Sequence, residues 1–457
     1  MNRSLYLVFI IIGYTLGIWT FTVIPKIYMT IGLKGLLLML AFSVVIVAGV
    51  LGQINSIKEK TYRVHEFMIK SARLPAVSVV LAGFLFFVSA VIAHYTGLAV
   101  EKLFGIGVPG FGLLIALIAM IILIGARGRS LDAIAVFSIL FIILIIVSVF
   151  LLRLKVDEVV VKETSKEFVR TTLNTVFSFS GELSLRTVVL TFLATLMMFG
   201  LGVGFYYIIG MTISGWKFDI KKVLAVVVIL QVILSLSAVL ILTYSIGAAH
   251  QAYWSAFEKG KAMEALDVYD KYFLPLWREY TSPERMNFLK LVDTVYGIPA
   301  ILRQLGMEGG RYIIAFLMLS LFFGGFTTLL VLMEIGGQIV SDMFQVTRKN
   351  AIIIVSIVTG ILSILLSLST IKEVLVTLTT LMLPLFALIE SLPALKATKG
   401  SGRVAEVIFE ILVAVFFIAA LVSALQSGGD AILMGVVLGL LLLSPLVFNN
   451  FLLKSTR

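Results

Sequence analysis

Glycine-rich interruptions inside two long apolar segments constrain the fold of this chain more than any other sequence feature. The first apolar segment is interrupted at Gly13-Tyr14-Thr15-Leu16-Gly17, and the sixth at Gly200-Leu201-Gly202-Val203-Gly204. Glycine is a poor helix former, and a broken helix in a membrane leaves backbone N–H and C=O groups that need partners. Two matched breaks are typical of inverted-repeat transporters, whose broken helices hold a solute at the bilayer midplane. Close helix packing through small residues is the alternative explanation.

The composition places the chain in a lipid bilayer. Of the 457 residues, 60% are hydrophobic and only 13% are charged, a balance that no soluble globular domain shows. We therefore predict an all-α integral membrane protein whose apolar stretches cross a hydrocarbon core of ~30 Å. Twelve such stretches are predicted, near residues 5–29, 35–54, 76–100, 108–126, 131–152, 187–212, 223–247, 312–341, 351–370, 374–395, 404–426 and 431–453.

The spans suggest a single transmembrane domain, residues 1–457, with two inverted repeats of five spans each. The first repeat would cover residues 5–152 and the second 187–395, with two peripheral helices at 404–453. Two long extracellular loops are expected, at 153–186 and 248–311. The first loop carries both signs of charge at helical spacing, which predicts an exposed helix. The second is rich in aromatic residues, and we expect it to form a lid on the outer face.

The net charge of +11 reflects membrane topology rather than a nucleic-acid partner. Basic residues gather on connections that would be cytoplasmic, for example Lys58, Lys60, Arg63, Lys70 and Arg73. An even number of spans then puts both termini in the cytoplasm, and we expect a multi-pass protein of the cell membrane. The chain has no cysteine, only three scattered histidines and no catalytic or phosphate-binding pattern. We therefore expect neither an enzyme nor an organic cofactor, and the sequence does not indicate an oligomeric state.

The eighth span contains a possible cation site, Phe323-Gly324-Gly325-Phe326-Thr327-Thr328. Sodium is a hard cation that binds several oxygen ligands, and two adjacent hydroxyls with a carbonyl one turn earlier would supply them. The alternative is that each threonine bonds only to its own helix backbone, which is frequent.

Several segments resemble the neurotransmitter:sodium symporter family, which couples uptake of amino acids and amines to a sodium gradient. The resemblance covers residues 5 to about 395 in family order. It rests on Leu16-Gly17-Ile18-Trp19-Thr20-Phe21, on Gly200-Leu201-Gly202-Val203-Gly204, on Ile298-Pro299-Ala300-Ile301, on Phe323 to Thr328, and on Phe386 to Leu392 with Glu390 in place of the family glutamate. It implies a LeuT-type fold and a sodium-coupled symporter.

The resemblance also implies one sodium site and the loss of a second. The implied ligands are the carbonyls of Ile11, Tyr14 and Gly324 and the hydroxyls of Thr327 and Thr328. At the family's other sodium site, apolar residues replace the oxygen-bearing side chains, and Gln231 is the one polar candidate. Losing those oxygens from a dehydrated ion costs several kcal/mol, so we expect that second site to be absent or heavily altered.

The substrate pocket implied by the resemblance is mostly apolar. Its residues would be Gly13, Leu16, Gly17, Phe87, Met197, Gly200, Val203, Thr328 and Leu332. A hydrophobic amino acid is the expected substrate, although the methionines could equally be ordinary core residues.

Charged residues within the apolar helices suggest further roles. Glu334 and Glu390 are carboxylates at membrane depth, where such groups are usually paired or functional. Lys26 could replace a missing outer-gate arginine with Glu373 as its partner, or could extend to the interface. Two alternatives follow: a proton-coupled or exchange carrier that uses Glu334, and a non-transporting membrane sensor or partner protein.

Overall fold

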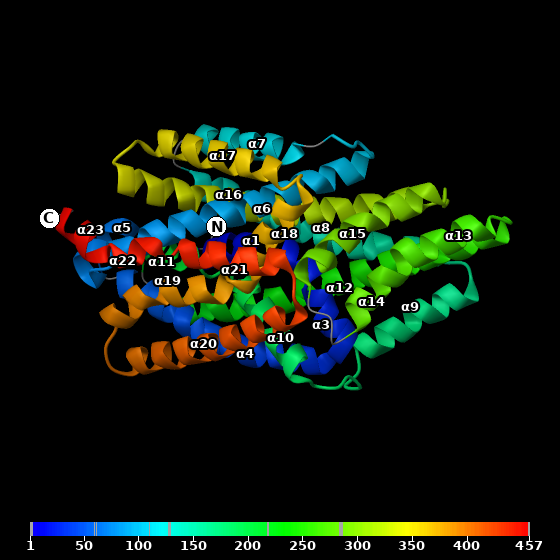
Figure 1. Cartoon of the computed structure of the whole chain (residues 1–457), viewed down its shortest axis with the longest axis horizontal. Coiled ribbons are helices and arrows are strands. Elements are labelled where there is room, and N and C mark those ends of the chain that lie inside the picture. The colour runs from blue at the N-terminus through cyan, green and yellow to red at the C-terminus, as the bar shows by residue number, and fades with distance from the viewer. Residues whose placement is uncertain are drawn as a thin grey trace.

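The computed structural model describes residues 3–58, 60, 62–108, 110–126, 129–216, 219–282 and 287–455, and within these ranges every regular element is helical. Part of the predicted fourth span (residue 109) and part of the second long loop (283–286) lie outside the described residues. The helices lie side by side along the long axis of the molecule (Figure 1). Helices α9 and α13 extend beyond the bundle at one end, which we call the lid end, and the C-terminus lies at the other, the terminal end.

The first half of the chain forms helices at the positions predicted for the first five spans. They are α1 (Arg3–Thr15), α2 (Ile18–Thr22), α3 (Ile24–Ile31), α4 (Leu33–Lys58), α5 (Val64–Phe67), the π-helical turn η1 (Met68–Ala72), α6 (Pro75–Phe104), α7 (Phe111–Gly125) and α8 (Ser130–Val159). Helix α9 (Glu163–Val176) follows in the first long loop, where the charge pattern predicts a helix.

The second half contains the remaining spans and the lid. The helices at the positions predicted for these spans are α10 (Leu185–Phe199), α11 (Phe205–Thr212), α12 (Ile220–Glu258), α16 (Gly310–Phe344), α17 (Arg348–Leu365), α18 (Ser369–Leu381), α19 (Leu383–Ala397), α20 (Ser401–Ser427), α21 (Asp430–Leu441), α22 (Ser444–Val447) and α23 (Asn449–Ser455). Between α12 and α16 lie α13 (Ala262–Val268), η2 (Tyr269–Phe273), α14 (Leu274–Thr281) and α15 (Phe288–Gln304), which together we call the lid.

The chain is a multi-pass membrane protein by the length and apolarity of its helices. Within the described residues, eight helices are long and apolar enough to cross a membrane, or ten if each of two bent pairs counts as one span. The bent pairs are residues 3–31, which turn by 63°, and 369–397, which turn by 45°. Helices α7 and α10 are apolar but have only 15 residues each. The count of twelve spans and the division into two repeats therefore stay predictions.

Both predicted breaks are present. Helix α1 ends at Thr15 and α2 begins at Ile18, while α10 ends at Phe199 and α11 begins at Phe205. In the second break, Gly200, Gly202 and Gly204 have φ values of 63°, 96° and 86°. These left-handed conformations suit glycine, because a Cβ would clash with the neighbouring carbonyl. The glycine pattern therefore fixes where the sixth span stops being a helix.

The lid is attached to the first broken helix by a buried cation. The Lys26 side chain on α3 is 0% exposed, and its Nζ donates to the backbone carbonyls of Glu279 and Ser282, the latter at 3.0 Å. The Tyr280 hydroxyl donates to the carbonyl of Thr22 at 2.7 Å. Extension of Lys26 to the interface is thus incorrect, because the lid covers the lysine and supplies its acceptors.

We expect Lys26→Met to loosen the lid. The carbonyls of Glu279 and Ser282 would lose a charged donor, which costs about 1–3 kcal/mol for the Glu279 carbonyl if it stays buried. Hydrogen–deuterium exchange should be faster in residues 274–282 than in the wild-type protein. Lys259→Met, a change at an exposed lysine, is the control. Unchanged exchange in the Lys26 variant would show that other contacts hold the lid.

Candidate functional site

A small cavity lies between the two helix breaks. Its volume is about 30 Å³, more than the roughly 10–15 Å³ that a cavity needs to hold one water molecule. The predicted pocket residues that line it are Gly17, Met197, Gly200, Val203, Thr328 and Leu332. The lining residues that sequence reasoning missed as pocket residues are Tyr14, Thr15, Trp19, Val88, Ile92, Leu201, Thr379 and Leu383. An amino acid would need these apolar side chains to move apart, which flexible methionine allows.

Three predicted pocket residues lie elsewhere. Gly13 packs against α8, where a Cβ at this position would stand 1.8 Å from the Ser138 hydroxyl. The carbonyl oxygen of Leu16 faces Gly324 on α16 and would lie 3.4 Å from a Cβ placed at Gly324. Phe87 packs against the apolar core while its neighbour Val88 reaches the cavity. A shift of one residue along a helix turns the side chain by about 100° around the axis. A distant sequence resemblance does not fix the alignment to a single residue, so it can assign the wrong neighbour to the pocket.

Four of the five oxygens predicted to bind sodium lie together. The Thr328 hydroxyl donates to the carbonyl of Tyr14 at 3.1 Å and to that of Gly324 at 3.0 Å. The Thr327 hydroxyl lies 3.2 Å from the Gly324 carbonyl and 2.9 Å from that of Phe323. Both threonines therefore bond to carbonyls of their own helix, which is the alternative to a cation site given above. Thr328 also bonds to the carbonyl of Tyr14 at the first break.

This convergence fits a hard cation. Gly17 makes it possible, since a Cβ at this position would lie 2.9 Å from the Thr328 hydroxyl oxygen. A cation between α1 and α16 would replace the hydroxyl–carbonyl hydrogen bond and draw on the same oxygens. Ile11, the fifth predicted ligand, lies in the continuous part of α1.

Thr15 adds an oxygen to this region. Its hydroxyl is buried beside the cavity and has no hydrogen-bond partner. Buried hydroxyls are normally satisfied, so one that faces a cavity at a helix break is available to a ligand. A threonine next to the glycine break is the sequence signal that could have identified it.

The region of the second sodium site is poor in oxygen. Gln231 on α12 donates to the Met198 carbonyl at 3.4 Å, and its amide oxygen is buried without a partner. Ile18 and Met198, two of the apolar residues that replace oxygen-bearing side chains of the family, are buried. The absence of this site stays a prediction.

Glu390 on α19 stabilises the second break. Its carboxylate accepts hydrogen bonds from the backbone N–H groups of Gly202 and Gly204, the latter at 3.0 Å. The Tyr207 hydroxyl donates to the carbonyl of Glu390 at 2.6 Å. An acceptor carboxylate at the start of α11 satisfies the free donors and complements the helix dipole.

Glu334 is part of an ion pair near the terminal end. Arg348 at the start of α17 donates to both carboxylate oxygens, at 3.2 Å from Nε and 2.5 Å from Nη2. Glu334 and Arg348 line a cavity of about 500 Å³. A second ion pair, Arg63 with Asp342 at 2.9 Å, lines the same cavity. These two pairs hold α16 against α17 and against the segment before α5.

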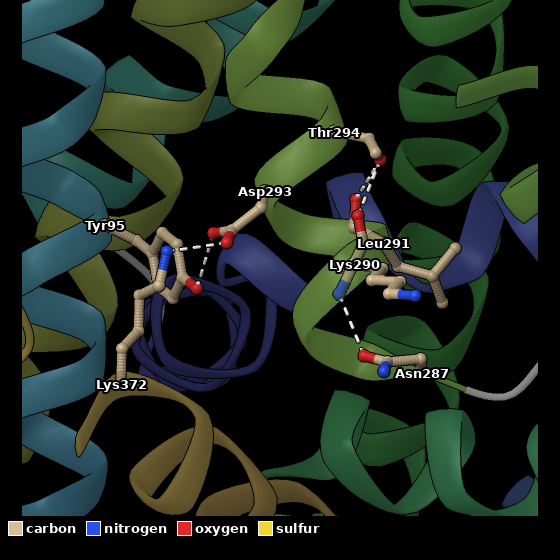
Figure 2. A network of polar contacts seen from close by, with 7 residues as sticks. All are labelled: Tyr95, Asn287, Lys290, Leu291, Asp293, Thr294 and Lys372. Atoms are coloured by element: carbon tan, nitrogen blue, oxygen red, sulfur yellow. Dashed lines mark hydrogen bonds and ion pairs between the residues drawn. The ribbon is translucent and has the colours of Figure 1, made fainter. Parts of the chain in front are cut away.

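At the lid end, Asp293 links the lid to the bundle. Figure 2 shows Tyr95 of α6 and Lys372 of α18 converging on this carboxylate of α15. The Lys372 ammonium lies 2.6 Å from Oδ2, and the Tyr95 hydroxyl donates to Oδ1 at 3.0 Å. Glu373, the residue suggested as a partner for Lys26, lines a separate cavity of about 490 Å³ beside the lid.

Comparison with solved structures identifies the architecture. The crystal structure of MhsT in complex with L-phenylalanine matches with a TM-score of 0.61, covering 93% of this chain and 98% of that chain. The chain has a LeuT-type fold. The sequence identity is 16%, so the likeness concerns the fold. The sequence itself matches no protein-family model and no curated protein.

We expect Glu390→Ala to destabilise the LeuT-type fold at its second break. Two buried N–H groups would lose their acceptor, at a cost of about 1–3 kcal/mol each. The apparent unfolding temperature of the purified protein should fall, and Glu390→Gln, which keeps an acceptor oxygen, should lower it less. Glu182→Ala, at an exposed glutamate, provides the control. Equal unfolding temperatures for wild type and Glu390→Ala would rule out this role.

Proposed function

We propose that this protein is a sodium-coupled symporter that takes up hydrophobic amino acids by alternating access. The observation that carries the proposal is the contact between the Thr328 hydroxyl and the Tyr14 carbonyl, which joins α16 to the first helix break. The small apolar cavity beside this contact and the fold shared with a protein crystallised with L-phenylalanine support it.

Sodium in this proposal connects two parts of the molecule. The ion binds the carbonyls of Tyr14 and Gly324 and the hydroxyls of Thr327 and Thr328. Because the ligands come from both α1 and α16, binding favours the arrangement in which these helices are held together. A ligand that binds one arrangement better shifts the population toward it, which is how a sodium gradient would drive substrate uptake.

The substrate site in this proposal is the cavity between the breaks. The N–H groups at the start of α2 favour a carboxylate, and carbonyls at the end of a half-helix favour an ammonium group, whereas the start of α11 is already capped by Glu390. Met197, Val203, Ile92 and Leu332 surround the side-chain region with apolar surface. A zwitterion with a hydrophobic side chain matches these properties better than a sugar or a polyanion does.

Closure at each end uses charged pairs. At the lid end, Asp293 and Lys372 hold α15 against α18. At the terminal end, Arg63–Asp342 and Arg348–Glu334 border the larger cavity. Alternating access requires that one set of contacts opens while the other stays closed. The Arg63–Asp342 and Lys372–Asp293 pairs are partly exposed and therefore weak enough to separate, whereas Glu334 is buried beneath Arg348.

A sodium gradient should drive uptake of labelled phenylalanine into proteoliposomes that contain the purified protein. Uptake should be several-fold faster with an inward sodium gradient than with potassium on both sides. Liposomes without protein provide the background. Equal uptake under both conditions, above the background, would rule out sodium coupling but would still show that the protein transports phenylalanine.

Thr327→Val should weaken sodium activation. Valine keeps the shape of threonine but removes one oxygen, and Thr327 does not line the substrate cavity. We expect the sodium concentration for half-maximal uptake to rise at least about tenfold, which corresponds to about 1.4 kcal/mol. Thr359→Val on α17 is a matched control, because Thr359 is also buried and its hydroxyl has no partner. Unaltered sodium dependence in Thr327→Val would place the ion elsewhere.

A further inference from the structure

Glu406 on α20 is a buried carboxyl group that the proposed transport mechanism does not use. Its side chain is 0% exposed and lies against α4 at Gly52, where a Cβ would stand 1.4 Å from Oε1. One turn away, the ring of Phe409 would lie 2.7 Å from a Cβ at Gly49. Because Gly49 and Gly52 have no side chains, Phe409 and Glu406 of α20 can pack directly against the backbone of α4.

The Glu406 carboxyl has no partner that could stabilise a negative charge. Neither oxygen forms a hydrogen bond. Among the residues that the structure describes, no lysine, arginine or histidine lies within ion-pair distance of it. The amide of Gln53, next to Gly52, is likewise buried without a partner. An ionised carboxylate in such surroundings costs far more free energy than a neutral carboxylic acid does.

Other acidic groups lie near Glu406. Glu410, one turn along α20, interacts electrostatically with it and accepts a hydrogen bond from the Ser391 hydroxyl at 2.9 Å. Tyr207 of α11 interacts electrostatically with Glu390, Glu406 and Glu410. These groups extend from the second helix break toward α20, and none of them carries a positive charge.

The remaining helices against α20 do not supply a counter-charge. Helices α10, α18 and α21 also contact it. Their ionisable residues are Arg186, Lys372, Glu373 and Asp430, at the N-terminal ends of these helices. The lysines of α4 and α19 are Lys34, Lys58 and Lys396, and none of them donates a hydrogen bond to the Glu406 oxygens. Arg186 and Glu373 line the cavity beside the lid together with Ser423, which lies near the C-terminal end of α20. Glu406 lies near the N-terminal end of α20, about two-thirds of the helix length from Ser423.

We propose that Glu406 is a proton-binding site whose protonation allows α20 to pack against α4. The carboxylic acid keeps its proton while α4 covers it at Gly52. When α4 moves away from α20, water reaches the group, the O–H bond ionises and the proton passes to that water. Coupling of this step to transport rests on the function proposed above, whereas proton binding itself does not.

The test compares wild type, Glu406→Gln and Glu158→Gln, in which an exposed glutamate is neutralised. The unfolded chain releases a carboxyl proton above about pH 4.3, while the folded site retains it. The folded wild-type protein should therefore lose stability as the pH rises from about 5 to about 8. We expect the apparent unfolding temperature to fall less over this range in Glu406→Gln than in the other two proteins. The infrared carbonyl band of a protonated carboxyl group should be weaker in this variant alone.

Identical pH profiles and infrared bands in all three proteins would overturn the proposal. Stabilisation of the wild type, but not of Glu406→Gln, by sodium or potassium chloride at about pH 8 would also overturn it, because the site would then bind a metal cation. These readouts need no transport, so they separate failure of the proton site from failure of the proposed function. If both hold, a pH gradient should alter phenylalanine uptake by the wild type but not by Glu406→Gln.

A second variant tests the geometry without removing the carboxyl group. Gly52→Ala places a methyl group where the Glu406 oxygen lies, so it should destabilise the wild type. In a Glu406→Ala background the same change should be tolerated, because the space is empty. A double-mutant cycle in the unfolding temperatures measures this coupling. Additive effects would show that Glu406 does not occupy the Gly52 notch.

Discussion

The free backbone at the two helix breaks is the constraint on which the rest of this structure depends. Lipid offers no hydrogen bonds, so each group released by unwinding must find a partner within the protein. Side chains from distant helices supply them: Glu390 accepts from Gly202 and Gly204, and Thr328 donates to Tyr14. The breaks therefore fix where α19 and α16 must lie, and the small cavity between the breaks follows from that arrangement.

Charged side chains inside the bundle obey the same rule. Glu334 has Arg348, and Lys26 has the carbonyls at the end of α14. Glu390 has the N–H groups of the second break. Glu406 has no such partner, so no neighbouring group would stabilise a negative charge on it. Partnered charges hold helices together in one arrangement, whereas a carboxyl that depends on its proton makes the arrangement sensitive to pH.

Glycine patterns predicted the fold well because a break in a helix is a local property. The expected interruptions in the first and sixth spans are confirmed, and so is the helix in the first long loop. The site was harder to predict: six of the expected pocket residues line the cavity, but Phe87 gives way to Val88, and Gly13 packs against Ser138. Which side of a helix faces a cavity depends on rotation about its axis, and neighbouring helices set that rotation.

The sequence by itself determined that this chain spans a membrane, where two of its helices break, and which oxygen-bearing side chains are available near the breaks. These properties follow from apolar length and glycine content, both of which act over a few residues. Only the tertiary structure decided that the lid buries Lys26, that Glu390 caps the second break and that Glu406 fills the space at Gly52. Those pairings join segments far apart in the chain, and close packing of whole helices brings them together.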